Sequence, residues 1–211
     1  MSVAATVAGV SVQICEVDAR EAVLRAAPQV AALPRPNTSE GRQLRRWLTQ
    51  LVVAEKLVAR EAEVLGVIVT ADTPGETDLL PDPTARLEIG SIAAAVLSDP
   101  VARAVFAHVT SDVAVDDGAV VDFHRRNPRK FLQFKQTGGW RVSFEPDFAE
   151  VRPLIVDHLL SAAQRRRFRL WLQKRRADLV WLAPGYEHPG DPRQPDNTHK
   201  QIGRASCRER V

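Results

Sequence analysis

The sequence contains few of the residues and motifs that mark several protein classes. Its 211 residues include two cysteines, Cys15 and Cys207, too few for a disulfide framework. No stretch approaches the roughly 18 apolar residues of a membrane-spanning helix, and residues 1–12 lack the basic start of a signal peptide. The phosphate-binding loop, the dinucleotide fingerprint, the CxxC pair and the HExxH zinc motif are also missing. These absences favour a soluble, cytoplasmic protein that acts on no membrane, and they identify no reaction.

The chain is basic, with a formal net charge of +3, but its last ten residues account for most of that charge. Residues 202–211 read IGRASCRERV. We identify them as a translated sequencing adapter, because ATC-GGA-AGA-GCG-TCG-TGT-AGG-GAA-AGA-GTG encodes this string and the next adapter triplet is a stop codon. Three arginines against one glutamate give the segment a charge of +2, so the net charge without it is +1. We therefore expect a native sequence that reads to about Lys200 and no nucleic-acid partner.

Hydrophobic periodicity predicts a mainly α fold with small β-strand and hairpin elements. Thr38 or Ser39 is expected to cap the clearest helix, and Gly66 to end it. The expected helices span residues 16–27, 44–65, 85–97, 100–109, 116–126 and 147–178, with an extended segment at 7–12, a loop at 70–84, a hairpin within 132–144 and a strand at 179–182.

The longest expected helix, 147–178, carries two apolar stripes that face in different directions. We therefore predict either a bend near residues 164–167 or two separate docking surfaces. Residues 1–183 are expected to form a single helical domain, followed by a polar tail at 184–200 and the adapter-derived residues 201–211.

Two segments contain most of the candidate functional residues: the polar tail and an arginine-rich run. In the tail, His188, His199, Asp191 and Glu187 offer nitrogen and oxygen ligands for a divalent metal, although a docking tail or a solvated tail also fits. The run at 165–176 is interpreted as a solvated helix face rather than a nucleic-acid surface, with Phe168 and Trp171 in the core. Glu55 lies within an apolar stripe, where it is a functional acid, the partner of an arginine or a residue at the edge of the stripe.

Four segments, in their order along the chain, resemble the SurA/PrsA-type peptidyl-prolyl isomerase chaperones. VAGVSVQICEVDAR at 7–20 is similar to the V-N-G-x-x-I-x-x-x-E-V-D start of those domains, and 44–67 to their second helix. FHRRNPRKF at 123–131 and FAEVRPLI at 148–155 are similar to their N-P-x-x-F and F-x-E-V-x-x-x-I segments. The resemblance implies a SurA-like helical domain whose N-terminal strand pairs with the strand at 179–182.

The departure from this family pattern points to a function without catalysis. In those chaperones a parvulin domain of about 90 residues lies between the last two segments, whereas here residues 132–147 occupy that place, and the parvulin histidines are missing. The expected function is a non-catalytic chaperone or binding module for a peptide or protein, held in an apolar groove between helices.

A second resemblance suggests an enzyme instead. EGRQLRRWLTQ at 40–50 and GYEHPGDPRQPDNTH at 185–199 look like small actinobacterial proteins labelled malonyl-CoA–acyl-carrier-protein transacylase. That label implies a carrier-protein partner, although the G-x-S-x-G serine elbow of acyl transfer is missing. The alternative function is therefore an acyltransferase, or a metal-dependent enzyme that uses the tail.

Overall fold

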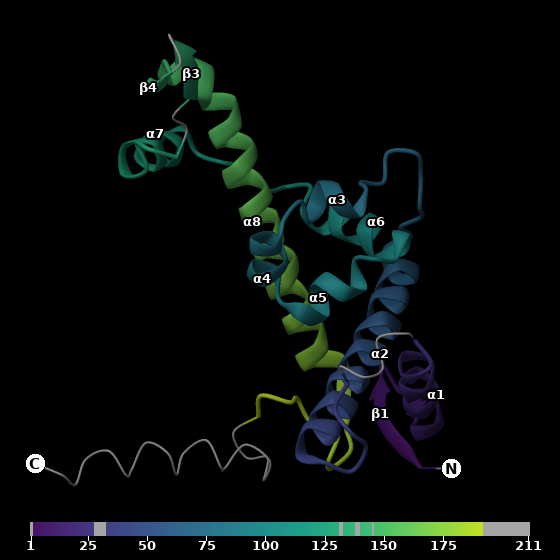
Figure 1. Ribbon diagram of the computed structural model, residues 1–211. Coiled ribbons are helices and arrows are strands. Elements are labelled where there is room, and N and C mark those ends of the chain that lie inside the picture. Colours follow the sequence, from purple (N-terminus) through teal and green to yellow (C-terminus); the bar gives the residue numbers. More distant parts are fainter. Residues whose placement is uncertain (1, 28–32, 131–132, 138–139, 145, 192–211) are drawn as a thin grey trace, which may run out of the picture.

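Helices dominate the part of the chain that the computed structural model describes, which comprises residues 2–27, 33–130, 133–137, 140–144 and 146–191. The mainly α prediction is confirmed (Figure 1). None of the described helices combines the length and apolar composition that a membrane span requires. The helices are α1 (Ile14–Arg25), α2 (Ser39–Leu65), α3 (Glu76–Leu79), α4 (Pro83–Ile89), α5 (Ser91–Val96), α6 (Pro100–Val109), α7 (Asp117–Arg126) and α8 (Phe148–Leu179); the strands are β1 (Val3–Val7), β2 (Val10–Gln13), β3 (Gln133–Thr137), β4 (Trp140–Phe144) and β5 (Val180–Leu182).

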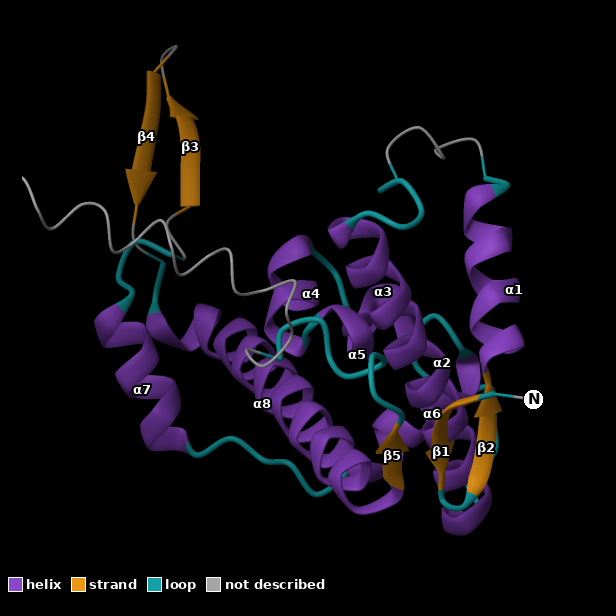
Figure 2. Cartoon of the chain, turned by 90° about the horizontal axis from the view of Figure 1, so that it is seen from below, coloured by secondary structure: helices purple, strands orange, loops and turns teal. Residues whose placement is uncertain are grey.

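A three-stranded antiparallel sheet, in the order β2-β1-β5, joins the start of the chain to the end of α8 (Figure 2). Ala8 and Gly9 both have positive φ angles, 49° and 83°, and they form the tight turn between β1 and β2. The extended segment predicted at 7–12, with its glycine turn, therefore contains the last residue of β1, the turn and most of β2. The N-terminal strand pairs with β5 as expected, but the paired strand is β1, which lies mostly before the predicted segment, with Thr6 opposite Trp181.

Helix α2 lies between this sheet and the remaining helices, and its ends are set by local side-chain and backbone chemistry. The Thr38 hydroxyl accepts a hydrogen bond from the Gly41 N–H at 3.1 Å, and Gly66 ends the helix with φ 64°. Both predicted caps are confirmed. Leu51, Leu57 and other apolar residues of the helix join the main core, which also contains side chains from α5, α6, α8 and β1.

Two short helices replace the single helix predicted at 85–97. Gly90 has a φ of 92°, a conformation that ends α4 and begins α5 in a new direction. The predicted loop at 70–84 contains α3, which is only four residues long. Hydrophobic periodicity misses both features, because it indicates which side chains are apolar and not the backbone conformation at each residue.

Helix α8 packs against two separate surfaces, which was one of the two predicted alternatives. It continues without interruption through residues 164–167. Val151 and Ile155 pack with Val120 of α7 in a small core of their own, whereas Phe168 and Leu172 belong to the main core. Figure 1 shows α7 and the β3–β4 hairpin at the far end of α8 from the sheet.

The arginine run of α8 is only partly the solvated face that the sequence predicted: Arg166, Arg167 and Lys174 are exposed, but other members of the run are not. Arg165 is buried and donates two hydrogen bonds to the Glu88 carboxylate, at 2.8 and 3.0 Å. Arg175 forms a bidentate pair with Glu61 of α2, at 2.6 and 2.7 Å, and Glu61 is only 3% exposed. These arginines therefore fix α8 against α4 and α2. Phe168 lies in the core, as predicted.

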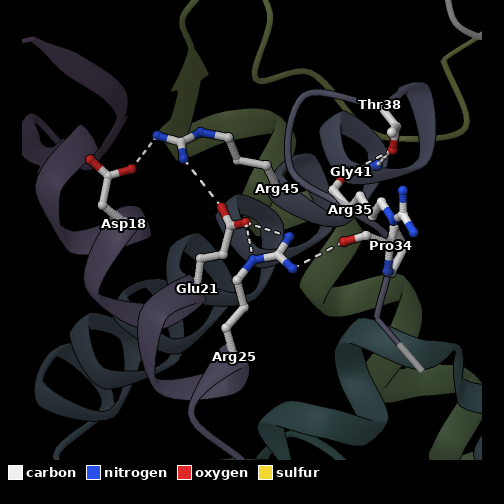
Figure 3. A network of polar contacts seen from close by, with 8 residues as sticks. All are labelled: Asp18, Glu21, Arg25, Pro34, Arg35, Thr38, Gly41 and Arg45. Atoms are coloured by element: carbon white, nitrogen blue, oxygen red, sulfur yellow. Dashed lines mark hydrogen bonds and ion pairs between the residues drawn. The ribbon is translucent and has the colours of Figure 1, made fainter. Parts of the chain in front are cut away.

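A second ionic network joins α1 to α2 (Figure 3). Arg45 of α2 pairs with Asp18 and Glu21 of α1. Glu21 also accepts from Arg25, whose Nη1 donates to the Pro34 carbonyl at 3.0 Å. The network therefore holds α1, α2 and the segment before α2 together.

Close backbone approach at the start of α2 requires a glycine at position 41. A Cβ built on Gly41 would overlap the carbonyl oxygen of Arg35. Because the overlap is with backbone, Gly41→Ala is expected to lower the free energy of unfolding by about 1–3 kcal/mol, as measured by urea denaturation. Glu40→Ala, an exposed change in the same turn, is the control, with an expected effect within about 0.5 kcal/mol. Equal effects of the two changes would contradict this account.

Removal of Arg175 should leave an uncompensated charge inside the protein. Arg175→Ala is expected to lower the free energy of unfolding by about 2–4 kcal/mol, because Glu61 loses its partner while it stays buried. The control is Arg167→Ala on the same helix, whose pair with Asp112 is exposed on both sides and is worth at most about 1 kcal/mol.

The double variant Glu61→Leu/Arg175→Met separates loss of the ion pair from loss of packing. It is expected to recover most of the stability, because two apolar side chains of similar volume leave no buried charge. A double variant as unstable as Arg175→Ala would show that packing, and not the charge, dominates at this position.

Candidate functional site

The predicted metal ligands lie partly within and partly outside the described residues. Glu187, His188 and Asp191 are described, whereas His199 lies outside. Glu187 accepts a hydrogen bond from the Gly185 N–H at 2.8 Å, and His188 Nδ1 accepts one from the Gly190 N–H at 3.0 Å. Nowhere in the described ranges do three His, Cys, Asp or Glu side chains gather as a metal would require.

The hydrogen bond at His188 fits a metal ligand poorly. A neutral imidazole that accepts at Nδ1 carries its proton on Nε2. Coordination through Nε2 would move that proton to Nδ1 and break the bond from Gly190. The metal site with His199 therefore stays a prediction, without support from the described part of the segment.

The segment that follows β5 is anchored on α2. Buried Gln50 donates from Nε2 to the Tyr186 carbonyl at 2.8 Å, and Arg46 Nε donates to the Gly185 carbonyl at 3.2 Å. These two bonds bring His188 to the edge of a cavity between α2, the junction of α4 and α5, and α8. The start of the predicted polar tail is thus packed against the helical core.

The cavity has a volume of about 360 Å³ and is open on one side. Gly90 and Ser91 form part of its wall, and Trp47 Nε1 donates to the Ser91 hydroxyl at 3.3 Å. Its lining combines apolar and polar side chains, and α5 and α8 each contribute both kinds. The apolar lining is Val53, Ala54, Leu57, Ile89, Ile92, Ala93 and Leu172; the polar side chains are Ser91, Arg169, Gln173, Arg176 and His188.

Two arginines line this cavity without a carboxylate partner among the described residues. Arg169 donates from Nη1 to the Glu88 carbonyl at 2.9 Å, and its buried Nε has no hydrogen-bond partner. Arg176 donates to the side-chain oxygen of Gln50. Both acceptors are neutral, so two positive charges lie beside an apolar floor.

Burial and charge shift the pKa values of the groups around the cavity. Burial lowers the pKa of Arg176 below its usual range. Partial desolvation lowers the pKa of His188, Arg176 lowers it further, and Asp191 opposes the shift. The lowered pKa favours the neutral form of the His188 ring, and Arg169 and Arg176 supply positive charge to the cavity.

Glu55, the other candidate acid of the sequence, is the partner of an arginine. Arg20 of α1 donates to its carboxylate at 2.7 Å. Desolvation raises the pKa of Glu55, and the Arg20 charge opposes this rise. Glu55 therefore links α1 to α2, in agreement with the predicted pairing with an arginine.

The sequence interpretation missed the cavity because it assigned Arg169 and Arg176 to a solvated face and Gly90 to the interior of a helix. One signal was present. Arg169, Leu172 and Arg176 are spaced at three and four residues, which places them on one side of a helix. The cavity-facing side of α8 therefore combines cations with a core leucine.

Comparison with known proteins gives one partial match. Residues 3–40 match a family of unknown function, DUF7158. The matched segment contains β1, β2, α1 and the first residues of α2, and it lies outside the cavity lining. No curated protein and no solved structure matches the chain.

The titration of His188 tests the environment of the cavity edge. We expect its pKa, measured by NMR of the imidazole resonances, to lie below 6.5, because desolvation and Arg176 disfavour the charged ring. Arg176→Gln should raise this pKa, and Asp191→Asn should lower it. The unfolded state, with its ordinary histidine pKa, binds the proton at a higher pH than the folded state does. The free energy of unfolding should therefore fall as the pH drops from the unfolded-state pKa towards the folded-state pKa of His188.

His188→Gln assigns the resonance and should remove this part of the pH dependence. A His188 pKa that does not respond to Arg176→Gln would show that the two groups are not close in solution.

Proposed function

We propose that the chain is a non-catalytic module that binds a peptide or protein partner, in the manner of the SurA-type chaperones that its sequence resembles. The observation that carries the proposal is the half-open cavity of about 360 Å³ between α2, α5 and α8, with its apolar floor. Ligand pockets have volumes of about 300–1,000 Å³ and are mostly apolar with a few placed polar groups. Grooves between helices are a common place for peptides to bind.

The topology agrees with the resemblance at one specific point. The SurA-like motifs imply that the N-terminal strand pairs with the strand that follows the last helix, and β1 pairs with β5 in this way. The hairpin β3–β4 occupies the place at which those chaperones carry their isomerase domain. This hairpin is far too short for such a domain, which supports binding without isomerisation.

A bulky side chain at the mouth of the cavity should block binding. Gln173 lines the cavity and is exposed, so Gln173→Trp places a large ring there without disturbing the core. We expect this variant to bind a fluorescently labelled, permanently unfolded polypeptide at least about tenfold more weakly than the unchanged chain, as measured by fluorescence anisotropy.

Val23→Trp is the matched control, because it adds the same ring to a side chain of α1 that is 70% exposed. It should leave the affinity unchanged. If no unfolded polypeptide binds the unchanged chain, the proposal is wrong. Efficient cis–trans isomerisation of a proline peptide would contradict its non-catalytic part.

A further inference from the structure

Four arginines of α8, Arg165, Arg169, Arg175 and Arg176, differ in what neutralises them. Arg165 and Arg175 each pair with a carboxylate, Glu88 and Glu61, and both pairs hold helices together. Arg169 and Arg176 line the cavity, and within the described part of the chain each donates to a neutral oxygen atom. On this helix, the two arginines that hold helices together have carboxylate partners from α4 and α2, whereas the two that line the cavity have none among the described residues.

An unpaired arginine at a partly buried position is unfavourable unless an anion compensates it. The described part of the chain provides Arg176 with no such anion, and burial alone accounts for its lowered pKa. Arg169 adds a second cation two helical turns away, with a buried Nε that lacks a partner. An anion from outside would stabilise both groups, since guanidinium groups bind carboxylates with charge-assisted hydrogen bonds.

The apolar floor restricts which anion fits. Val53, Leu57 and Leu172 lie beside the arginines, so the ligand must combine a negative group with an aliphatic group within a few ångströms. The volume lies near the lower end of the range of about 300–1,000 Å³ for ligand sites, which favours a chain end over a chain that passes through. The last residue of a peptide, with its α-carboxylate and an aliphatic side chain, has this chemistry.

We propose that the cavity binds the C-terminal residue of the partner peptide, with its carboxylate on Arg176 and Arg169 and its aliphatic side chain on the floor formed by Val53, Leu57 and Leu172. This inference rests on the proposed function and specifies its ligand. Gln50 is a positioning residue, because its side-chain oxygen accepts from Arg176 while its amide group holds the Tyr186 carbonyl.

The test compares two peptides that differ only at the C-terminus. A fluorescein-labelled Gly/Ser peptide that ends in leucine is titrated with the full chain, once as the free acid and once as the amide. We expect the acid to bind at least about tenfold more tightly, with an affinity that falls as salt is raised, whereas the amide shows little salt dependence. Equal affinities of acid and amide would overturn the proposal.

Substitutions of the cavity arginines test whether the preference for the free acid over the amide arises in the cavity. Arg176→Gln should abolish the difference between acid and amide, and Arg169→Gln should reduce it. Arg166→Gln, an exposed change on the same helix outside the cavity lining, should leave it intact. Circular dichroism and thermal melts report whether each variant folds. If Arg176→Gln does not fold, Arg169→Gln and the comparison of peptides on the unchanged chain still decide the question.

Three further outcomes separate this inference from the proposed function. If unfolded polypeptides bind and Gln173→Trp blocks them, but acid and amide bind equally, the proposed function stands and the chain-end inference is wrong. If a peptide with an internal aspartate and an amidated end competes as well as the acid, the site binds acidic side chains and the inference is wrong. If isovalerate binds but no peptide does, the ligand is a small carboxylic acid, and both proposals fail.

Discussion

Helix α2 lies in the middle of the molecule and carries four polar side chains into the interior: Arg46, Thr49, Gln50 and Glu61. Each of them needs a hydrogen-bond partner, because an unsatisfied polar group in the interior costs on the order of 1–3 kcal/mol. Thr49 bonds to the carbonyl one turn earlier in its own helix. The other three have partners in the last third of the chain, so the packing of α8 and of the segment after β5 depends on these groups of α2.

The candidate site also depends on the need of the buried polar groups of α2 for hydrogen-bond partners. Gln50 satisfies its amide group with the Tyr186 carbonyl and its oxygen with Arg176, so one buried side chain fixes both a backbone segment and a cation at the cavity. Glu61 neutralises Arg175 one residue earlier in α8. Adjacent arginines therefore have opposite roles: one carries a full ion pair for stability, and the other keeps its charge available beside an apolar floor.

Features that depend on neighbouring residues were predicted from the sequence better than features that depend on residues far apart in the chain. Thr38 and Gly66 act within one helical turn, and both caps of α2 were predicted. Gly90 also acts locally, but a glycine within an apolar pattern is compatible with a helix interior, and its φ of 92° decides otherwise. Arg169 and Arg176 could not be assigned, because their partners come from α4 and α2, more than 80 residues away in sequence.

The small core around Val120 is linked to the main core mainly by helix α8. α7 and the first half of α8 form the small core, and the second half of α8 belongs to the main core that surrounds the cavity. Arg165 lies at the boundary, where it bonds to Glu88 and to the Leu79 carbonyl. Arg165 is buried whereas the Glu88 side chain is 41% exposed, and their ion pair fixes α8 on α4 beside this boundary. Ile89, the last residue of α4, lines the cavity and precedes Gly90, so the same pair helps to hold the cavity wall in place.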